Sequence, residues 1–250
     1  MKKEYAIYPF EFMNITQNWN QGNHVPHWKG VTNWSDKPWD EACKDGGRSY
    51  FVPQNDYVVE EVLGLGNNIT NTVRLKSVNK LYIPFKEEPD YLYLTLTHMN
   101  EDNLRQVHVG QVLTKGTKIL LEGTDGYSTG NHFHITANLG KYWGFLQNNN
   151  GTWCFTYDKS LIPEEAFYVD TNFTTVRSTN GSAFKNVPIE EPQEAPKEAP
   201  EQTKEEERPI TPPKEETTEN EEEIKVNVGF VNKILEIILS FLKKLFSIKD

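Results

Sequence analysis

Two histidines separated by one residue, His132 and His134, have the spacing in this chain that most directly indicates chemistry. They stand in Asn131-His132-Phe133-His134-Ile135, a run that predicts a strand. Successive side chains point to opposite faces of a strand, so we expect both imidazoles on one surface and Phe133 on the other. Two imidazoles held side by side can supply one zinc ligand and one general base. The alternative is a pair of surface histidines on a half-exposed strand.

A hydrolytic zinc site needs about three protein ligands and one open position for water. The remaining histidines that could take part are His24, His27, His98 and His108. His98 directly follows an apolar run, residues 91–97, and the end of a strand is a place where a side chain can reach a cleft. His108 has no comparable setting and is interpreted as a surface residue.

The elements that must position these histidines are predicted to be strands over residues 1–187. Short runs of β-branched and aromatic residues recur at intervals of roughly ten residues, which is typical of an antiparallel β-fold. Helical periodicity is hardly detectable in this part of the chain. A glycine-rich turn, residues 123–130, leads directly into the His132–His134 strand. The runs are residues 57–59, 72–75, 80–83, 91–97, 118–122 and 132–135.

Several of these segments also resemble one known family, the lysostaphin-type zinc metalloendopeptidases that cut peptidoglycan, and in particular its phage and prophage endolysin members. The resemblance covers about residues 8–140. The segments that carry it are Asn14-Ile15-Thr16-Gln17 before a histidine, Pro38-Trp39-Asp40-Glu41 followed by Gly47-Arg48, Leu96-Thr97-His98, and Gly123-Thr124-Asp125-Gly126 running into Gly130-Asn131-His132-Phe133-His134.

The resemblance implies a twisted antiparallel sheet with a catalytic groove, and a zinc ion held by His24, Asp40 and His134. Asp40 is preferred to Asp36 because it stands in the Pro-x-Asp setting before the Gly-Arg pair. The spacing from Ile15-Thr16-Gln17 favours His24, and His27 is the alternative. The separation of His24 from Asp40 exceeds the compact H-x-x-x-D spacing of many family members, so this chain requires a loop insertion there.

By the same resemblance, His132 and His98 are the histidines beside the metal that do not bind it. A neutral imidazole can accept a proton from a water molecule near neutral pH. We assign His132 as the base and His98 as the group that stabilises the oxyanion. The two roles could be reversed.

Residues 141–187 are interpreted as a C-terminal extension of the peptidase domain that completes the wall of the groove. Trp143 and Trp153 in this extension could form an exposed carbohydrate-binding patch. Burial is the more frequent outcome for such aromatic side chains, and we expect it here.

The acidic net charge of −10 is concentrated in residues 188–225. Fourteen glutamates and four basic residues lie between Glu190 and Glu223, and the rest of the chain has 22 acidic and 22 basic residues. Seven of the fourteen prolines fall between Pro188 and Pro213. Such a segment cannot bury enough apolar area to offset its chain entropy, so we expect a disordered linker. Nothing in the chain resembles the basic surface of a nucleic-acid-binding protein.

Residues 226–250 return to apolar composition with helical spacing and predict an amphipathic helix. Because this segment has a polar side and several charges, we do not expect it to span a membrane. We expect it to lie on a membrane surface or to associate with itself, and docking onto the globular domain is the alternative. Its apolar face comprises Val231, Ile234, Leu235, Ile238, Phe241, Leu242, Leu245 and Phe246.

These features favour a zinc-dependent peptidoglycan endopeptidase, used in phage lysis. The N-terminus has no apolar segment of secretory length, so the protein is expected to be made in the cytoplasm and to act on the bacterial cell wall. Two alternatives stay open: a non-catalytic wall-binding or regulatory module with the same fold, and a tail-associated wall peptidase used during phage entry. The presence of every ligand type favours the enzyme.

Overall fold

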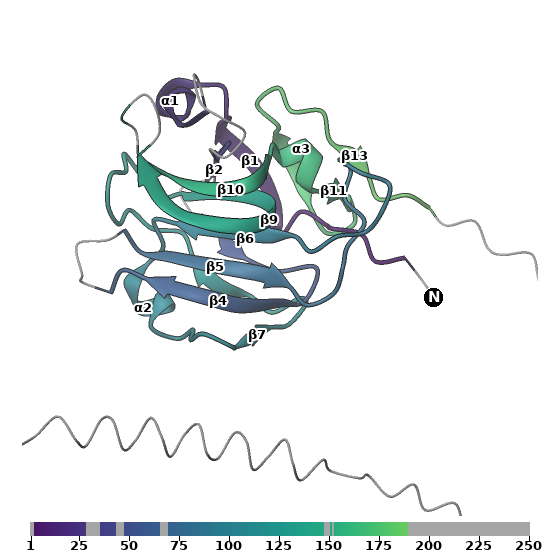
Figure 1. Ribbon diagram of the computed structural model, residues 1–250. Coiled ribbons are helices and arrows are strands. Elements are labelled where there is room, and N and C mark those ends of the chain that lie inside the picture. Colours follow the sequence, from purple (N-terminus) through teal and green to yellow (C-terminus); the bar gives the residue numbers. More distant parts are fainter. Residues whose placement is uncertain are drawn as a thin grey trace, which may run out of the picture. The chain divides into compact units, whose positions relative to one another are not determined.

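The structure is a computed structural model that describes residues 3–28, 36–43, 48–65, 70–147, 151 and 153–189, apart from the side chains of residues 27 and 28 (Figure 1). All of these residues belong to one unit of the chain, Met1–Pro192. The predicted linker beyond residue 189 and the predicted helix at 226–250 lie outside the described residues.

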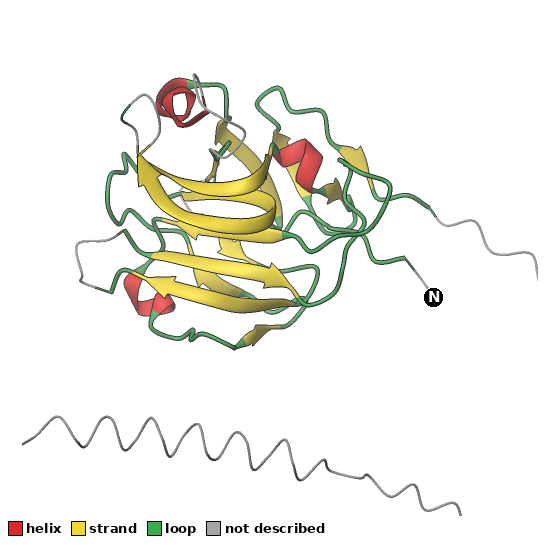
Figure 2. Cartoon of the chain, in the orientation of Figure 1, coloured by secondary structure: helices red, strands yellow, loops and turns green. Residues whose placement is uncertain are grey.

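Strands are the predominant secondary structure of the described chain, and the helices are short (Figure 2). No helix among the described residues has the length and apolar character needed to cross a membrane. The strands are β1 (Phe12–Gln17), β2 (Trp39–Glu41), β3 (Tyr50–Phe51), β4 (Tyr57–Leu63), β5 (Thr72–Ser77), β6 (Tyr93–Thr97), β7 (Val112–Leu113), β8 (Ile119–Leu121), β9 (Phe133–Gln147), β10 (Trp153–Leu161), β11 (Tyr168–Val169), β12 (Thr175–Ser178) and β13 (Lys185–Asn186). The helices are a 3-10 turn, η1 (Gly22–His24), and α1 (Val25–Trp28), α2 (Glu101–Leu104) and α3 (Pro163–Ala166).

The main sheet has the strand order β12-β1-β2-β9-β6-β5-β4-β7, and β10 pairs with β9 (Figure 1). Its neighbouring strands are antiparallel except for β1 and β12, which are parallel. The mainly β fold predicted from the sequence is confirmed. The sheet is mixed rather than purely antiparallel because β12 returns from the far end of the domain, and no local pattern reports the direction of such a long-range pairing.

Strand β9 is the centre of this arrangement. It pairs with β2 and β6 along its first residues and with β10 along the rest, including residues beyond 141. The extension predicted to begin near residue 141 therefore starts within a strand. Phe133, Ile135 and Ala137 alternate along β9 and are each at most 1% exposed, as the strand period requires.

The core beneath the sheet is strongly aromatic. Phe10 contacts Phe51 and Phe133, and Tyr8 contacts Phe10 and Phe167, with ring centroids 5.4–6.0 Å apart. Burial of each such side chain stabilises the fold by roughly 1.5–3 kcal/mol, and tilted or edge-on ring contacts add to this. Tyr8 and Phe10 therefore anchor the N-terminal segment in the core, against the sheet that carries the histidines.

The turn at residues 123–130 packs against residues 98–100, which follow β6 in the chain. The amide of His132 donates to the Gly123 carbonyl at 3.1 Å, and the Asn71 amide donates to the Asp125 carboxylate at 2.6 Å. A Cβ atom at Gly123 would lie 2.5 Å from the carbonyl oxygen of His98 and 2.7 Å from the Asn100 nitrogen. These neighbours are backbone atoms, so only glycine allows this close approach.

We expect Gly123→Ala to lower the free energy of unfolding by about 1–3 kcal/mol, because the added methyl group forces two backbone segments apart. Gly130→Ala is the matched control, since a Cβ atom there meets nothing within 4 Å, and its effect should stay within about 0.5 kcal/mol. Urea unfolding of both variants measures the difference. Equal stabilities would contradict the packing described for this turn.

Candidate metal centre

The side chains of Asp40 and His134 meet because their strands are paired in register. Asp40 of β2 lies directly opposite His134 of β9, and Thr97 of β6 lies opposite His134 on the other side. Residues opposite each other in an antiparallel ladder have Cβ atoms about 4.5–5.5 Å apart. The separation of 94 residues in sequence is thereby reduced to a distance of 3.2 Å between Asp40 Oδ1 and His134 Nδ1.

His24 reaches the same point from the end of β1. Gln17, the last residue of β1, is paired with Asp40, and the chain then turns back through η1 to His24. The His24 side chain is 3% exposed, and its Nδ1 lies 3.2 Å from the carbonyl oxygen of Asn18. A carbonyl oxygen only accepts hydrogen bonds, so Nδ1 carries a hydrogen and Nε2 is the nitrogen that can bind a metal ion.

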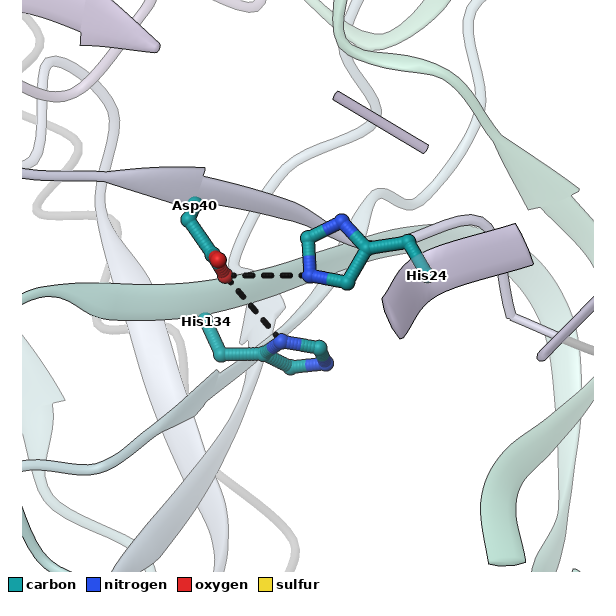
Figure 3. Close-up of side chains that lie close together, drawn as sticks. All are labelled: His24, Asp40 and His134. Atoms are coloured by element: carbon teal, nitrogen blue, oxygen red, sulfur yellow. Dashed lines mark hydrogen bonds and ion pairs between the residues drawn. The ribbon is translucent and has the colours of Figure 1, made fainter. Parts of the chain in front are cut away.

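This nitrogen faces Asp40, since His24 Nε2 is 3.2 Å from Asp40 Oδ1 (Figure 3). His24, Asp40 and His134 each offer one ligand atom, and these three atoms lie within 4.8 Å of one another. In a tetrahedral zinc site with bonds of about 2.0–2.1 Å, ligand atoms are roughly 3.3 Å apart. Both measured separations from Asp40 match this value, so the donor set fits a zinc ion. Among the described residues no other group of this kind is present.

The surroundings of Asp40 favour its charged form. Burial by itself would raise the pKa of Asp40, but hydrogen bonds with His134 and His24, together with their charge, hold it well below its usual range. A carboxylate must be deprotonated to bind a metal ion. Asp40 is therefore ready to act as a ligand at neutral pH.

The group that could hold a metal ion contains Asp40 and not the alternative carboxylate, Asp36, and it contains His24. The side chain of His27, the alternative to His24, is not among those described. The long separation from His24 to Asp40 in sequence is accommodated because β1 and β2 are adjacent and their connection begins and ends at one edge of the cleft. The free-energy cost of closing a longer loop grows only slowly with its length.

His132 lies beside this group without completing it. Its Nε2 is 3.6 Å from Asp40 Oδ1, and its Nδ1 is 2.8 Å from the carbonyl oxygen of Gly130 and 3.2 Å from Ser128 Oγ. The carbonyl fixes the hydrogen on Nδ1. The lone pair of His132 is then on Nε2, the nitrogen that is directed towards Asp40.

His98 contacts both histidines of the pair, with ring centroids 4.8 Å from His132 and 5.7 Å from His134. Its Nδ1 lies 2.6 Å from the carbonyl oxygen of Asp125, which again places the hydrogen on Nδ1. Burial, followed by the charge of His134, lowers the pKa of His98 to about 4. The backbone of His98 has a φ of +67°, an uncommon conformation for a residue with a side chain, and such conformations concentrate at functional sites.

Two residues that the sequence did not single out support the centre. Asn18 orients His24, as described above. Glu41 is fully buried beside Asp40 and accepts hydrogen bonds from the Tyr8 hydroxyl at 2.5 Å and the Asn14 amide at 2.8 Å. Burial raises the pKa of Glu41 to about 8. The alternation of β2 was a usable signal, because a polar residue next to Asp40 must face the opposite side of the sheet.

All five of these ligand and non-ligand side chains line one cavity of about 490 Å³, which we call the cleft; they are His24, Asp40, His98, His132 and His134. Aromatic residues of β9 and β10 form another part of its lining, including Phe145 and Trp153. The expectation that Trp143 and Trp153 are buried is wrong, since they are 51% and 56% exposed. Beyond Asn138 the hairpin that carries them pairs with no other described strand, so no strand of the described chain covers its outer end.

No protein-family model and no curated protein sequence matches this chain. One similar solved structure is a zinc-containing peptidase from Vibrio cholerae, with 18% identity, a TM-score of 0.35, and coverage of 64% of this chain and 38% of that one. Another is a mutant catalytic domain of the prophage-encoded M23 protein EnpA from Enterococcus faecalis, with 17% identity, a TM-score of 0.33, and coverage of 56% and 88%.

These two structures are thus peptidases, and this chain spans 38% of the length of the Vibrio cholerae protein. Both TM-scores are below 0.5, and the function proposed below is inferred from the side chains of the metal centre.

We expect the purified protein to contain about one zinc ion per chain. His24→Ala, Asp40→Ala and His134→Ala should each lose it, because two ligands hold zinc far more weakly than three. Zinc should also raise the Tm of the wild type but not of these variants, since it stabilises only the state that binds it. Elemental analysis and thermal unfolding measure the two effects.

His108→Ala and His27→Ala serve as controls for the zinc measurement. His108 is exposed and is not among the residues that line the cleft, so its variant should keep the metal. Loss of zinc in His27→Ala with retention in His24→Ala would assign the third ligand to His27 instead.

Proposed function

We propose that this protein is a zinc-dependent endopeptidase that hydrolyses peptide bonds of bacterial peptidoglycan. The observation that carries the proposal is the convergence of His24, Asp40 and His134 at zinc-ligand separations, with His98 and His132 beside them in the same cleft. A zinc ion held there would acidify a water molecule to a pKa near ~7 and polarise the scissile carbonyl. The substrate class follows from the sequence resemblance of the histidine-bearing segments.

The protein's own groups supply the proton transfers. Gly130 and Asp125 hold the hydrogens of His132 and His98 on Nδ1, so each ring has an unprotonated Nε2. His132 is the better placed base, because its Nε2 is 3.6 Å from Asp40 Oδ1, the oxygen that lies 3.2 Å from both proposed histidine ligands. A water molecule activated at this point would lose its proton to His132 Nε2, and the same nitrogen could later protonate the leaving amine.

The role of His98 is constrained by the same argument. Without a hydrogen on Nε2, a neutral His98 cannot donate a hydrogen bond from that nitrogen to an oxyanion. It can do so after taking up a proton, or it can itself act as the base, in which case the roles of His98 and His132 are reversed.

We expect His132→Ala and His98→Ala to digest purified cell walls roughly 10²–10⁴-fold more slowly than the wild type, because each removes a proton-transfer group. Both variants should still contain zinc, whereas Asp40→Ala and His134→Ala should lose zinc and activity together. Release of new amino groups from purified peptidoglycan measures the rate. Removing zinc with a chelator should abolish activity, and adding it back should restore it.

Undiminished wall digestion by Asp40→Ala and His134→Ala would sink the proposed site. A wild type that binds zinc and walls but releases no amino groups would favour the alternative, a non-catalytic wall-binding module. We place the role in phage lysis ahead of phage entry, because an acidic linker and a terminal amphipathic helix are not typical of a structural tail component. The protein would be made in the cytoplasm and act on the cell wall.

We further propose that residues 226–250 bind a membrane surface through their apolar face and keep the enzyme near the wall. The full chain should co-sediment with anionic liposomes at low salt, and a chain that ends at residue 224 should not. If neither chain sediments with liposomes and only the full chain is oligomeric in analytical ultracentrifugation, the helix serves self-association.

A further inference from the structure

The hairpin of β9 and β10 carries a row of aromatic rings along one side. Phe145 is paired with Phe155 in the ladder, and Tyr157 with Tyr142. The row is continuous, with ring-centroid distances of 5.3 Å for Tyr157–Tyr142, 6.3 Å for Tyr142–Phe155, 5.0 Å for Phe155–Phe145 and 5.7 Å for Phe145–Trp153.

Burial changes along this row. Tyr157 is fully buried and its hydroxyl is hydrogen bonded to Thr95, and Phe155 is 7% exposed. Phe145 and Trp153 at the outer end are 50% and 56% exposed. The inner rings have a structural role, because they fill the core. Packing does not explain the aromatic character of the outer pair, because about half of each side chain is exposed.

The outer pair belongs to the cleft that holds the metal centre. Phe145 and Trp153 line the same cavity of about 490 Å³ as His24, Asp40 and His134. A cavity of this size takes a ligand of a few residues, and such sites combine an apolar wall with a few polar groups. A ligand that fills it would contact the aromatic pair and the histidines at the same time.

Trp143 provides a contrast on the same hairpin. It is exposed to a similar degree, at 51%, but it does not line the cleft. Its Nε1 donates to the Asp158 carboxylate at 2.7 Å, and Lys141 Nζ lies 4.1 Å from the centre of its ring. Trp143 and Trp153 are therefore similar in exposure and differ in position, since only Trp153 lines the cleft.

The charges of the cleft restrict what it can hold. No lysine or arginine is among the described residues that line it, whereas the carboxylates of Asp36 and Asp40 are. Other residues of the lining offer hydroxyl groups, including those of Thr70, Thr72 and Ser128. Apart from the proposed zinc ion, whose open position is needed for water and the scissile carbonyl, the described lining gives an anionic segment no cationic partner, so its loss of hydration would be unfavourable. An uncharged segment with apolar groups suits both parts of the lining.

We propose that Phe145 and Trp153 form the substrate-binding wall of the cleft and hold an uncharged segment of the peptide next to the bond that is cleaved. The inference rests on the proposed endopeptidase function and names the part of the substrate that the site selects. The occupant is peptide rather than glycan, because the wall and the proposed ligands share one cavity only a few residues in extent.

The test uses the full chain loaded with zinc and two fractions of purified peptidoglycan. One fraction contains cross-linked peptides freed from sugar by an amidase, and the other contains the peptide-free glycan strands. Phe145→Ala/Trp153→Ala should lower kcat/KM on the sugar-free peptides by at least roughly tenfold, mainly through a higher KM, because apolar contact with both rings is lost. Trp153→Phe should retain most of the wild-type value, since it keeps an aromatic ring.

Trp143→Ala is the matched control and should stay within about twofold of the wild type, since its ring lies outside the cleft. Zinc content and Tm of the double variant should equal those of the control, which excludes loss of the fold. An equal KM for the double variant and the control would overturn the proposal that Phe145 and Trp153 bind the substrate. Tight binding of the glycan strands that depends on Phe145 and Trp153 would overturn the choice of peptide.

Failure of the proposed function has a different signature. If the wild type cleaves nothing, binding of the sugar-free peptides still tests the wall, with the heat of binding in titration calorimetry as the readout. That heat change should be present in the wild type and in Trp143→Ala and absent in the double variant. The same change in all three proteins, or in none, would overturn the wall independently of catalysis.

Discussion

Antiparallel pairing of β2 with β9 places Asp40 opposite His134, and every other feature of the metal centre is arranged around that contact. A shift of one residue in this register would turn the Asp40 side chain to the core side of the sheet. The register is fixed by the buried side chains of both strands. Trp39 and Glu41 flank Asp40 and are fully buried, and Phe133 and Ile135 flank His134. The alternation that buries these four residues also directs the two ligands into the cleft.

Backbone carbonyl groups prepare the remaining histidines. The carbonyls of Asn18, Gly130 and Asp125 each accept a hydrogen bond from the Nδ1 of one imidazole. Each contact places a hydrogen on Nδ1 and thereby assigns Nε2 the other role, that of a metal ligand in one case and of a proton acceptor in the others. The three carbonyls belong to turns rather than strands. The positions of these turns, such as the close approach of Gly123 to His98, therefore matter for the chemistry as well as for packing.

The long strand β9 serves two purposes along its length. Its first residues belong to the central sheet, and its later residues form the hairpin with β10. Rings at the inner end of that hairpin are anchored by the core, so the exposed rings at the outer end are held on a rigid element. Side chains on a strand are held in a better defined position than side chains on a mobile loop. Strand β9 in this way connects the metal centre, through His134, with the aromatic wall, through Phe145.

Local periodicity accounts for what the sequence alone could determine. The period of two in the His132–His134 run predicts both imidazoles on one face and a buried Phe133, and the turn-separated runs predict a mainly β fold. Both are confirmed, because the facing of a side chain depends only on its nearest neighbours in the strand. The candidate ligand residues were also named from local segments, although their binding of zinc stays a prediction.

Tertiary structure decided the features that depend on distant parts of the chain. It selected His24 as the neighbour of Asp40, made the β1–β12 pair parallel, set the tautomers of His98 and His132, and left Phe145 and Trp153 exposed. Each of these depends on which strand, turn or carbonyl lies beside a residue far away in sequence. Periodicity determines which way a side chain points, whereas only long-range pairing and packing determine what it meets there.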